Sequence, residues 1–317
     1  MKFLKILSVT ILSVFFLQAC SNNGSNKVGD VVTKKTIVDV AASNGSFTTL
    51  VAALQATGLD STLVDTETSF TVFAPTDDAF AKLPAGTLDS LSNEQLTDIL
   101  LYHVLLGKVM ADGAIKVAQS SGNMVETANG DKVSLSFVDS MLFVNGAKVS
   151  AADVMADNGV IHVIDNVIMP PAMMGTPTQN IVEVALADPD NFSTLVTALT
   201  AADLVTTLSN EEVTFTVFAP TNAAFAAVDP DALAALLADS EALTSVLLSH
   251  VVNDASLSSL DAYAANGKIL TTASGKTVDV TVDADSGTLM IGGVNVVISD
   301  VYTTNGVIHV IDTVILN

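Results

Sequence analysis

Apolar residues recur at helical spacing early in the chain. Phe47, Leu50, Val51 and Leu54 follow the i, i+3, i+4, i+7 pattern that puts side chains on one face of a helix. Gly58 comes soon after this run, and glycine is a common C-cap because it tolerates a left-handed backbone. The pattern predicts a short amphipathic helix that ends at Gly58.

A second helix is predicted after Ser92. Ser92 and Gln95 have the spacing of a capping box, in which each side chain bonds the other residue's backbone N–H. Leu96, Leu100 and His103 then fall on one face of the helix. This apolar setting favours a core histidine with hydrogen-bonded ring nitrogens over a ligand or a catalytic base.

Strand patterns dominate the following segment. Residues 132–149, "KVSLSFVDSMLFVNGAKV", alternate between apolar and polar positions and contain turn residues, which predicts hairpins. Helices are therefore concentrated in the first part of the unit and mostly antiparallel strands in the second. This arrangement indicates an α+β fold.

The stretch "FTVFAPT" combines a strand with a helix start. Phe70–Pro75 is apolar at both alternating sets of positions, which predicts a strand buried largely on both faces. Pro75 keeps the preceding residue extended and ends the ladder. Thr76 is placed to cap a new helix, with Asp77 and Asp78 in its first turn, where carboxylates favour the helix dipole.

The same seven letters return from Phe215 to Thr221. Asn222 and Ala223 follow there in place of the two acids, so both copies keep the geometry and not the charge. "NGVIHVID" likewise occurs at Asn158 and again at Asn305. The chain thus contains one unit of about 140 residues written twice, close to a common domain size.

The N-terminal residues have the pattern of an export signal. Lys2 and Lys5 precede an apolar run that ends at Leu17, too short and wrongly flanked for a spanning helix. Leu17–Cys20 resembles the lipobox of bacterial lipoproteins, in which the cysteine is acylated; the alternative is an ordinary secretory signal with an incidental cysteine. Ser21 implies, by the same resemblance, sorting to an outer membrane or cell surface.

These patterns divide the chain into five segments. They are a signal peptide at 1–20, a flexible tether at 21–34, a first domain at 35–170, a proline- and glycine-containing linker at 171–178, and a second domain at 179–317. We therefore expect an exported protein held on the cell envelope by a lipid on Cys20.

Charge narrows the range of partners. The chain has 12 basic residues against 34 acidic ones, for a formal net charge of −22. Such a surface repels phosphate backbones and anionic headgroups. We therefore expect no nucleic-acid partner.

Together these motifs resemble the fasciclin domain. "SFTVFAPTDDAF" and "TFTVFAPTNAAF" match the first signature segment of the family, and "NGVIHVID" matches the second. A Tyr-His pair usually lies between them and is matched by Tyr102-His103, whereas the second copy reads Ser249-His250. The resemblance implies an α+β fold of two tandem domains, each a mostly antiparallel β-wedge of about seven strands packed with helices.

The resemblance also implies a secreted or surface-bound adhesion protein without an established catalytic centre. It gives structural roles to the signature residues Thr76, Tyr102, His103, His162, Thr221, His250 and His309.

Histidines are the first candidates for chemistry, with two in each copy. A metal or acid–base site would need them to converge with carboxylates. His162 and Asp165 are three apart on a predicted strand and so point to opposite faces. A contact between His103 and His162 stays open, but two ligands without a third make a poor zinc site. We expect no metal and no cofactor.

Other segments that resemble binding or catalytic motifs lack residues that those motifs require. "DADSG" at 283–287 lacks the glycine and the distal glutamate of a calcium loop, and "SGKT" at 274–277 lacks the upstream glycine of a phosphate loop. Neither a nucleophile elbow nor a His-Glu-x-x-His pattern is present. We therefore expect no enzyme; a hydrolase would need His, Asp and Ser converging in one cleft.

One interaction motif is implied by the resemblance. In animal fasciclin domains, a short Asp-Ile-containing segment before the second signature is associated with integrin recognition. The matching positions are Asp153-Val154-Met155 and Asp300-Val301-Tyr302. The alternative is that both valines belong to the core and both acids end a strand.

The sequence thus predicts a lipid-anchored surface protein that makes noncatalytic contacts with an unknown surface protein, matrix or polysaccharide. The alternative function is the binding of a small apolar ligand, a lipid or a pigment, on the same scaffold, which would need a deep apolar cavity.

Overall fold

The structure is a computed structural model that describes residues 34–120, 122–171 and 177–316. The predicted signal peptide (1–20), most of the predicted tether and the centre of the predicted linker lie outside these residues. In the part of the chain that is described, no helix is long and apolar enough to cross a membrane.

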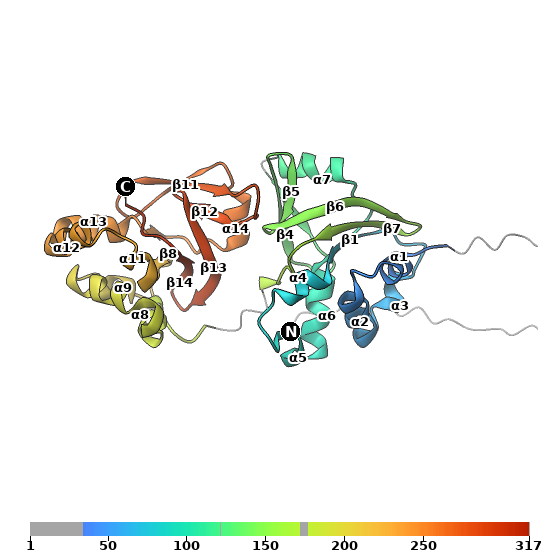
Figure 1. Ribbon diagram of the computed structural model, residues 1–317, viewed down its shortest axis with the longest axis horizontal. Helices are drawn as coiled ribbons and strands as arrows, with labels where there is room; N and C mark the ends of the chain where they lie inside the picture. Colours follow the sequence, from blue (N-terminus) through green and yellow to red (C-terminus); the bar gives the residue numbers. More distant parts are fainter. Residues whose placement is uncertain (1–33, 121, 172–176, 317) are drawn as a thin grey trace, which may run out of the picture. The chain divides into compact units, whose positions relative to one another are not determined.

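The first copy begins with helices and ends with strands (Figure 1). Its elements are α1 (Ile37–Ser43), α2 (Thr48–Thr57), α3 (Asp60–Leu63), β1 (Phe70–Pro75), α4 (Asp77–Ala81), α5 (Thr87–Ser90), α6 (Asn93–Tyr102), β2 (Val104–Leu106), α7 (Ala111–Ala118), β3 (Met124–Glu126), β4 (Lys132–Val138), β5 (Met141–Val144), β6 (Ala147–Ala156) and β7 (Gly159–Ile164).

The second copy repeats this order, and its α12 is longer than the equivalent α5. Its elements are α8 (Ile181–Ala187), α9 (Pro189–Ala201), α10 (Val205–Leu208), β8 (Phe215–Pro220), α11 (Asn222–Ala226), α12 (Pro230–Ala238), α13 (Ser240–Leu248), β9 (Val251–Asn253), α14 (Ser259–Ala264), β10 (Ile269–Thr271), β11 (Thr277–Val282), β12 (Leu289–Ile291), β13 (Val294–Thr303) and β14 (Gly306–Ile311).

Each copy contains one seven-stranded sheet, with the strand orders β2-β1-β7-β6-β5-β4-β3 and β10-β11-β12-β13-β14-β8-β9. The signature strands β1 and β7 pair in parallel, as do β8 and β14, and the other pairs are antiparallel. The predicted α+β fold, with about seven mostly antiparallel strands per copy, is therefore confirmed.

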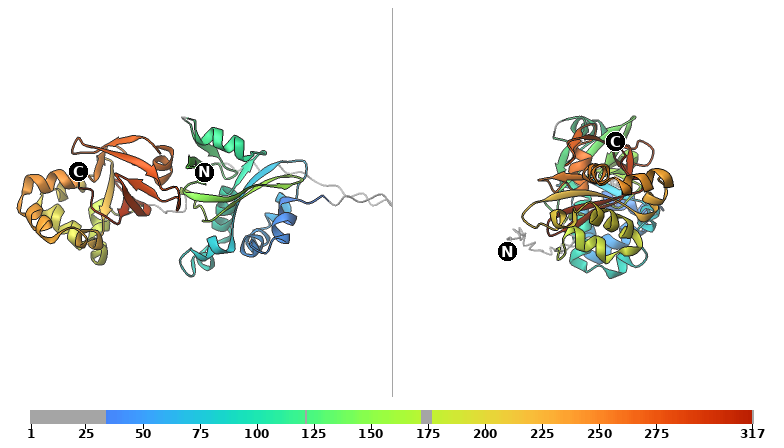
Figure 2. Two further views of the ribbon diagram at one scale, coloured as in Figure 1. Left: turned by 45° about the horizontal axis from the view of Figure 1, so that its top comes forward. Right: turned by 90° about the vertical axis from the view of Figure 1, so that its left-hand side faces the viewer.

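The strand β1 separates two cores because it is buried on both faces. Phe70, Val72 and Ala74 pack with the helices α1, α2, α4 and α6, whereas Phe73 packs with α7 and the strands β4 and β5. Figure 1 and the left-hand view of Figure 2 show α7 on the opposite side of the sheet from α1 and α2. A strand covered on both faces needs apolar residues at every position, which explains the repeated stretch.

The local signals of the sequence are confirmed. Helix α2 ends at Gly58, which has a left-handed backbone at φ 73°. Ser92 and Gln95 form both bonds of a capping box at the start of α6. Thr76 accepts a hydrogen bond from the backbone N–H of Ala79 and so caps α4.

Candidate functional site

His103 and His250 occupy equivalent places after α6 and α13. The Nδ1–H of His103 donates to the carbonyl of Ile99 (2.7 Å), and its Nε2 accepts from the backbone N–H of Ile168 (3.1 Å). His250 makes the same two bonds, of 2.8 and 2.9 Å, with the equivalent backbone groups. Burial lowers the pKa of each ring to about 4, so both are neutral near pH 7.

His162 and His309 lie on the parallel signature strands β7 and β14. The Nε2–H of His162 donates to the carbonyl of Val109 (2.9 Å), and its Nδ1 accepts from the backbone N–H of Asp153 (3.3 Å). His309 repeats these bonds at 2.8 and 3.3 Å. Each ring also packs on a phenylalanine of the neighbouring strand, with centroids 5.9 and 5.8 Å apart.

All four histidines therefore use both ring nitrogens within the fold. Burial also lowers the pKa of His309. In residues 34–120, 122–171 and 177–316, no group of three or more His, Cys, Asp and Glu side chains is arranged to hold a metal. The histidines join loops to the sheet and present no free nitrogen for proton transfer.

Asp153 and Asp300 cap helices that lie far away in the sequence. They stand within β6 and β13 at φ 59° and 62°, where the pairing register shifts. Asp153 accepts from the backbone N–H of Ala111, the first residue of α7, at 2.8 Å. Asp300 accepts from the backbone N–H of Ser259, the first residue of α14, at 2.6 Å, and also from its hydroxyl. Each carboxylate thus has an internal partner at the start of a helix, with one bond at Asp153 and two at Asp300.

The neighbours of these acids differ in exposure. Val154 and Val301 are half-buried and pack against the helix-side cores of their copies. Met155 is 51% exposed. Tyr302 is half-buried, and burial, followed by the charge of Asp300, raises its pKa to about 12. The matched positions therefore present different side chains to solvent in the two copies.

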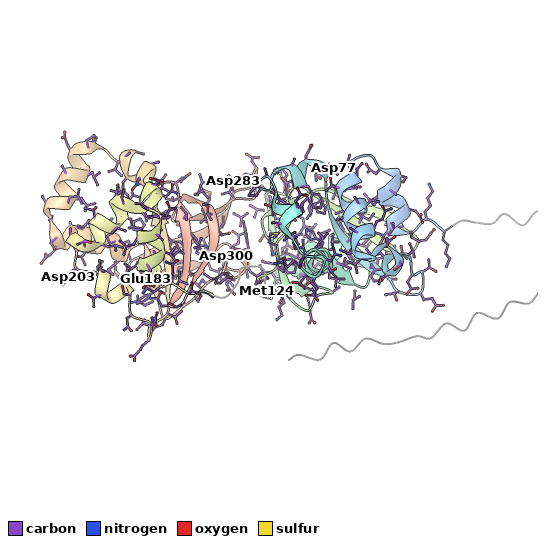
Figure 3. The ribbon with its side chains drawn as sticks, turned by 90° about the horizontal axis from the view of Figure 1, so that it is seen from below. Asp77, Met124, Glu183, Asp203, Asp283 and Asp300 are labelled. Atoms are coloured by element: carbon purple, nitrogen blue, oxygen red, sulfur yellow. The ribbon has the colours of Figure 1, made fainter. Side chains whose placement is uncertain are left out.

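Asp77 joins two helices. Its carboxylate accepts from the backbone N–H groups of Thr48 and Thr49 at the start of α2, at 3.2 and 2.8 Å. These hydrogen bonds lower its pKa to about 2, the bond from Thr49 most. Asn222 accepts the equivalent bond from Thr194 at 2.8 Å. Asp77 (labelled in Figure 3) thus has a structural partner that an amide can also satisfy.

Thr221 caps α11 as Thr76 caps α4, by accepting from the backbone N–H of Ala224 at 3.1 Å. Tyr102 is buried, and its hydroxyl donates to the carbonyl of Lys132 (2.7 Å) and accepts from the side-chain amide of Asn145 (2.8 Å). Burial raises the pKa of Tyr102 to about 12. In the second copy Ser249 replaces this tyrosine and bonds Ser274 instead.

The two copies meet at a pair of glycines. The described residues from Lys35 onward belong to one compact unit, in which the β5–β6 turn contacts α14. Gly146 has φ 77°, and a Cβ on it would lie 2.2 Å from the hydroxyl oxygen of Tyr263. A Cβ on Gly287 (φ 73°) would lie 2.1 Å from the carbonyl oxygen of Gly146. Only glycine fits at these two positions.

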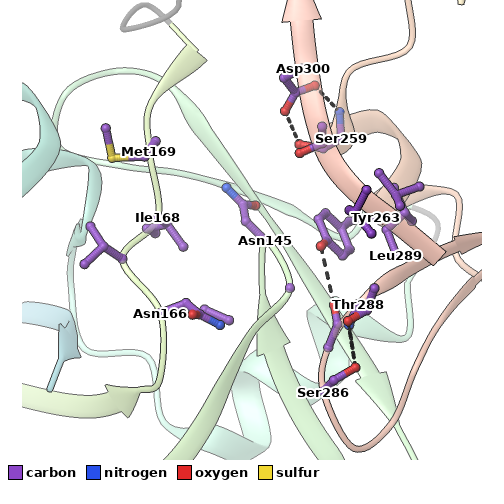
Figure 4. A pocket seen from close by; sticks show the side chains of 17 residues that line it. Asn145, Asn166, Ile168, Met169, Ser259, Tyr263, Ser286, Thr288, Leu289 and Asp300 are labelled. Atoms are coloured by element: carbon purple, nitrogen blue, oxygen red, sulfur yellow. Dashed lines mark hydrogen bonds between the residues drawn. The ribbon is translucent and has the colours of Figure 1, made fainter. Parts of the chain in front are cut away.

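A polar pocket of about 510 Å³ opens beside this contact. Figure 4 shows Asn145 and Asn166 of the first copy on one side of it and Ser259, Tyr263 and Thr288 of the second copy on the other. Polar side chains from distant segments thus converge here around a space of ligand size.

The enclosed apolar cavities are much smaller. One in the core of the second copy has about 20 Å³, and one in the first copy has about 10 Å³. These volumes correspond to about one water molecule, whereas drug-sized ligands occupy pockets of about 300 to 1,000 Å³. An open groove of about 620 Å³ beside α10 and β9 mixes apolar side chains such as Val213 with polar ones such as Asn253.

Of the residues that line the pocket, the sequence pattern singled out Asp300 but not the asparagines. Asn145 and Asn166 lie in turns next to strands, where a polar residue needs no special explanation. The available signal was the glycine that follows Asn145, together with Gly287 in the acidic turn of the second copy. Neither indicates its partner, because that partner belongs to the other copy.

Comparisons with known proteins agree with the duplicated architecture. The fasciclin domain model matches residues 45–170 and 190–317. Protein sll1483 of Synechocystis sp. is 49% identical over 140 residues, which are 43% of this chain and 74% of that protein. Transforming growth factor-beta-induced protein ig-h3 of Sus scrofa is 35% identical over 253 residues, which are 78% of this chain but only 35% of that protein.

Among solved structures, a FAS1 domain pair from the insect cell adhesion molecule Fasciclin I has a TM-score of 0.41 at 23% identity. That comparison covers 87% of this chain and 98% of the insect pair. Since the two matches to the family model span most of its length, the chain belongs to the fasciclin family and carries two tandem fasciclin domains.

Proposed function

We propose that this protein is a noncatalytic adhesion module, held on the cell envelope by a lipid on Cys20, whose fasciclin domains contact a surface protein, matrix or polysaccharide. Fasciclin domains are known in adhesion proteins, and the insect pair comes from a cell adhesion molecule. The ig-h3 protein is much longer than the matched region, so its partners are not transferred to this chain.

One observation carries the noncatalytic part of the proposal. The histidines and the strand aspartates that both copies share are engaged in hydrogen bonds inside the fold. A catalytic acid, base or nucleophile needs a group that can reach a substrate. The polar residues that both copies share are therefore better explained by a structural role than by a catalytic one.

The side chains available to a partner are those that surround the scaffold. Met155 stands beside the helix-capping Asp153 and is half exposed, and Tyr302 takes its place in the second copy. We propose both segments, Asp153–Met155 and Asp300–Tyr302, as partner-binding surfaces. Methionine adapts its shape to a partner, and tyrosine is enriched at protein interfaces.

The lipid anchor rests on the pattern around Cys20, which lies outside the described residues. Each acyl methylene that enters a bilayer contributes about 0.8 kcal/mol, so two or more chains hold a protein firmly. The apolar-ligand alternative has less support, because the enclosed apolar cavities described above hold about one water molecule each.

Deletion and complementation in the source organism test the proposal. Cells without the protein should attach less to surfaces and to one another, and the wild-type chain should restore attachment. Cys20→Ser should release the protein into the medium and fail to restore attachment. Met155→Asp should weaken attachment more than Leu106→Asp, a control at a position that is 70% exposed in the same copy. Unchanged attachment after deletion would refute the adhesive function.

A further inference from the structure

The pocket between the two domains has the size and lining of a binding site for a polar ligand. Its volume of about 510 Å³ lies within the usual range of ligand sites. Side-chain amides and hydroxyls line it from both domains: Asn145, Asn166, Ser259, Thr288 and Ser299. A pocket with this lining offers several directional hydrogen bonds.

Several of these groups keep hydrogen-bonding capacity for a ligand. Asn166 donates one amide hydrogen to Asp165 at 3.2 Å, which leaves a second amide hydrogen and a carbonyl oxygen. Thr288 accepts from the hydroxyl of Ser286 at 2.7 Å and still carries its own O–H donor. The hydroxyl of Ser299 has no hydrogen-bond partner within the described chain.

Charge argues against an anionic ligand. No lysine lines the pocket, and the chain carries a net charge of −22, so an anionic ligand would meet repulsion without a counter-charge. The one carboxylate, that of Asp300, already accepts two bonds from Ser259. An apolar ligand would remove these amides and hydroxyls from water without replacing their bonds, which is unfavourable.

We infer that this pocket binds an uncharged polyhydroxylated ligand, a sugar unit of a neutral polysaccharide. Sugar hydroxyls can both donate to and accept from the amides and hydroxyls of the lining. The ring of Tyr263 adds an apolar surface beside them. The inference rests on the proposed adhesive function, since it names the chemical class of a partner.

The site requires both domains, because neither copy has the complete set of groups. Asn145 corresponds to Gly292 in the second copy, and Tyr263 corresponds to Ile115 in the first. A ligand in the pocket contacts residues of both domains and therefore stabilises their contact. A duplicated scaffold thus forms one site that a single copy lacks.

Calorimetric titration of the purified full-length protein tests the inference. The probes are neutral gluco-, galacto- and manno-oligosaccharides, with alginate oligosaccharides as an anionic comparison. At least one neutral sugar should bind, and Asn166→Leu and Ser299→Val should each weaken its binding about five- to tenfold, the range expected for one lost hydrogen bond. Thr313→Leu is the matched control, because Thr313 is the exposed counterpart of Asn166 in the second copy and does not line the pocket.

Thermal unfolding of each variant, followed by circular dichroism, verifies that the fold is retained. The inference is overturned if the wild-type protein binds no neutral sugar, if it binds only alginate, or if the two pocket variants bind as the wild type does. Where Asn166→Leu alone unfolds the protein, Ser299→Val provides the same test from the other wall.

Attachment assays separate this inference from the adhesive function. If deletion abolishes attachment but the double variant Asn166→Leu, Ser299→Val restores it fully, the pocket inference fails and the adhesive function stands. If deletion changes nothing, the adhesive function fails whatever the titration shows.

Discussion

Replacement of His103 by glutamine tests how much stability depends on a neutral buried histidine. The pKa of His103 falls from 6.5 to about 4 because the ring is buried, although its bond to Ile99 opposes this shift. As the pH falls below 6.5, the unfolded chain binds a proton that the folded domain rejects until about pH 4. Stability is therefore lost over this window and changes little below it.

The difference between the pKa values of the folded and unfolded states determines how much stability should be lost on acidification. One pKa unit corresponds to about 1.4 kcal/mol, and integration from pH 7.5 to 4.5 gives a loss of about 2 to 3 kcal/mol for one such histidine. Glutamine cannot titrate, so the His103→Gln domain should lose about 2 to 3 kcal/mol less than the wild-type domain over this pH range. Its stability at pH 7.5 should be lower, because one of the two backbone partners loses its bond.

Urea unfolding at a series of pH values, followed by circular dichroism, measures this difference. His250→Gln is the matched variant, because His250 has the same bonds and a pKa of about 4 in the other domain. Proton NMR of the two rings provides an independent check, since neither should titrate above about pH 5. An unchanged pH slope in His103→Gln, or a ring that titrates near 6.5, would refute the reasoning.

Substitutions at three further contacts, with their controls, are tested by urea unfolding. Asp77→Ala should lower the free energy of unfolding of the first domain by about 1 to 2 kcal/mol, because it removes the bonds to α2. Asp77→Asn should lower it less, because the second copy has asparagine at this position. Equal losses for the two variants would contradict this reasoning. Ser134→Ala should raise the free energy of unfolding by about 1 kcal/mol, because the hydroxyl of Ser134 is buried without a partner in the described chain. A loss of stability would show that this hydroxyl is bonded. Gly146→Ala should cost more than Gly130→Ala, because both have positive φ but only Gly146 faces Tyr263; equal costs would refute the close contact.

Local spacing in the sequence predicted the elements but not their distant partners. Three features depend only on residues a few positions apart: the strand at Phe70–Pro75, the cap at Thr76 and the capping box at Ser92. The local sequence is therefore sufficient to predict them. The sequence pattern predicts that Asp77 acts on the dipole of its own helix, whereas its carboxylate also bonds residues 28 and 29 positions earlier. Asp153 likewise caps a helix that begins 42 positions before it. Such bonds follow from the topology of the sheet, which no short window of sequence contains.

Comparison of the two copies separates the residues that build the fold from those that distinguish the surfaces. Asn158 bonds the backbone at Ile37, Leu63 and Asp65, and Asn305 makes the equivalent three bonds in its own copy. Few other side chains could join three segments in this way. The presence of asparagine in both copies is therefore explained by the fold and does not require a ligand that both copies bind.

The side chains around the interdomain pocket, in contrast, differ between the two copies. The turn that carries Asn145 has glycine at the matched position, and the helix that carries Tyr263 has isoleucine. Asn145 is itself bonded inside the first domain, to the hydroxyl of Tyr102 and to the backbone N–H of Ser134, and Ser249 replaces that tyrosine in the second copy. Part of the difference at this turn therefore follows from the internal bonds of each domain. The divergence nevertheless falls on the lining of the pocket, whereas the signature histidines of both copies bond within their own domains. We therefore expect the ligand inferred above to be selected by the asymmetric lining and not by the shared signature segments.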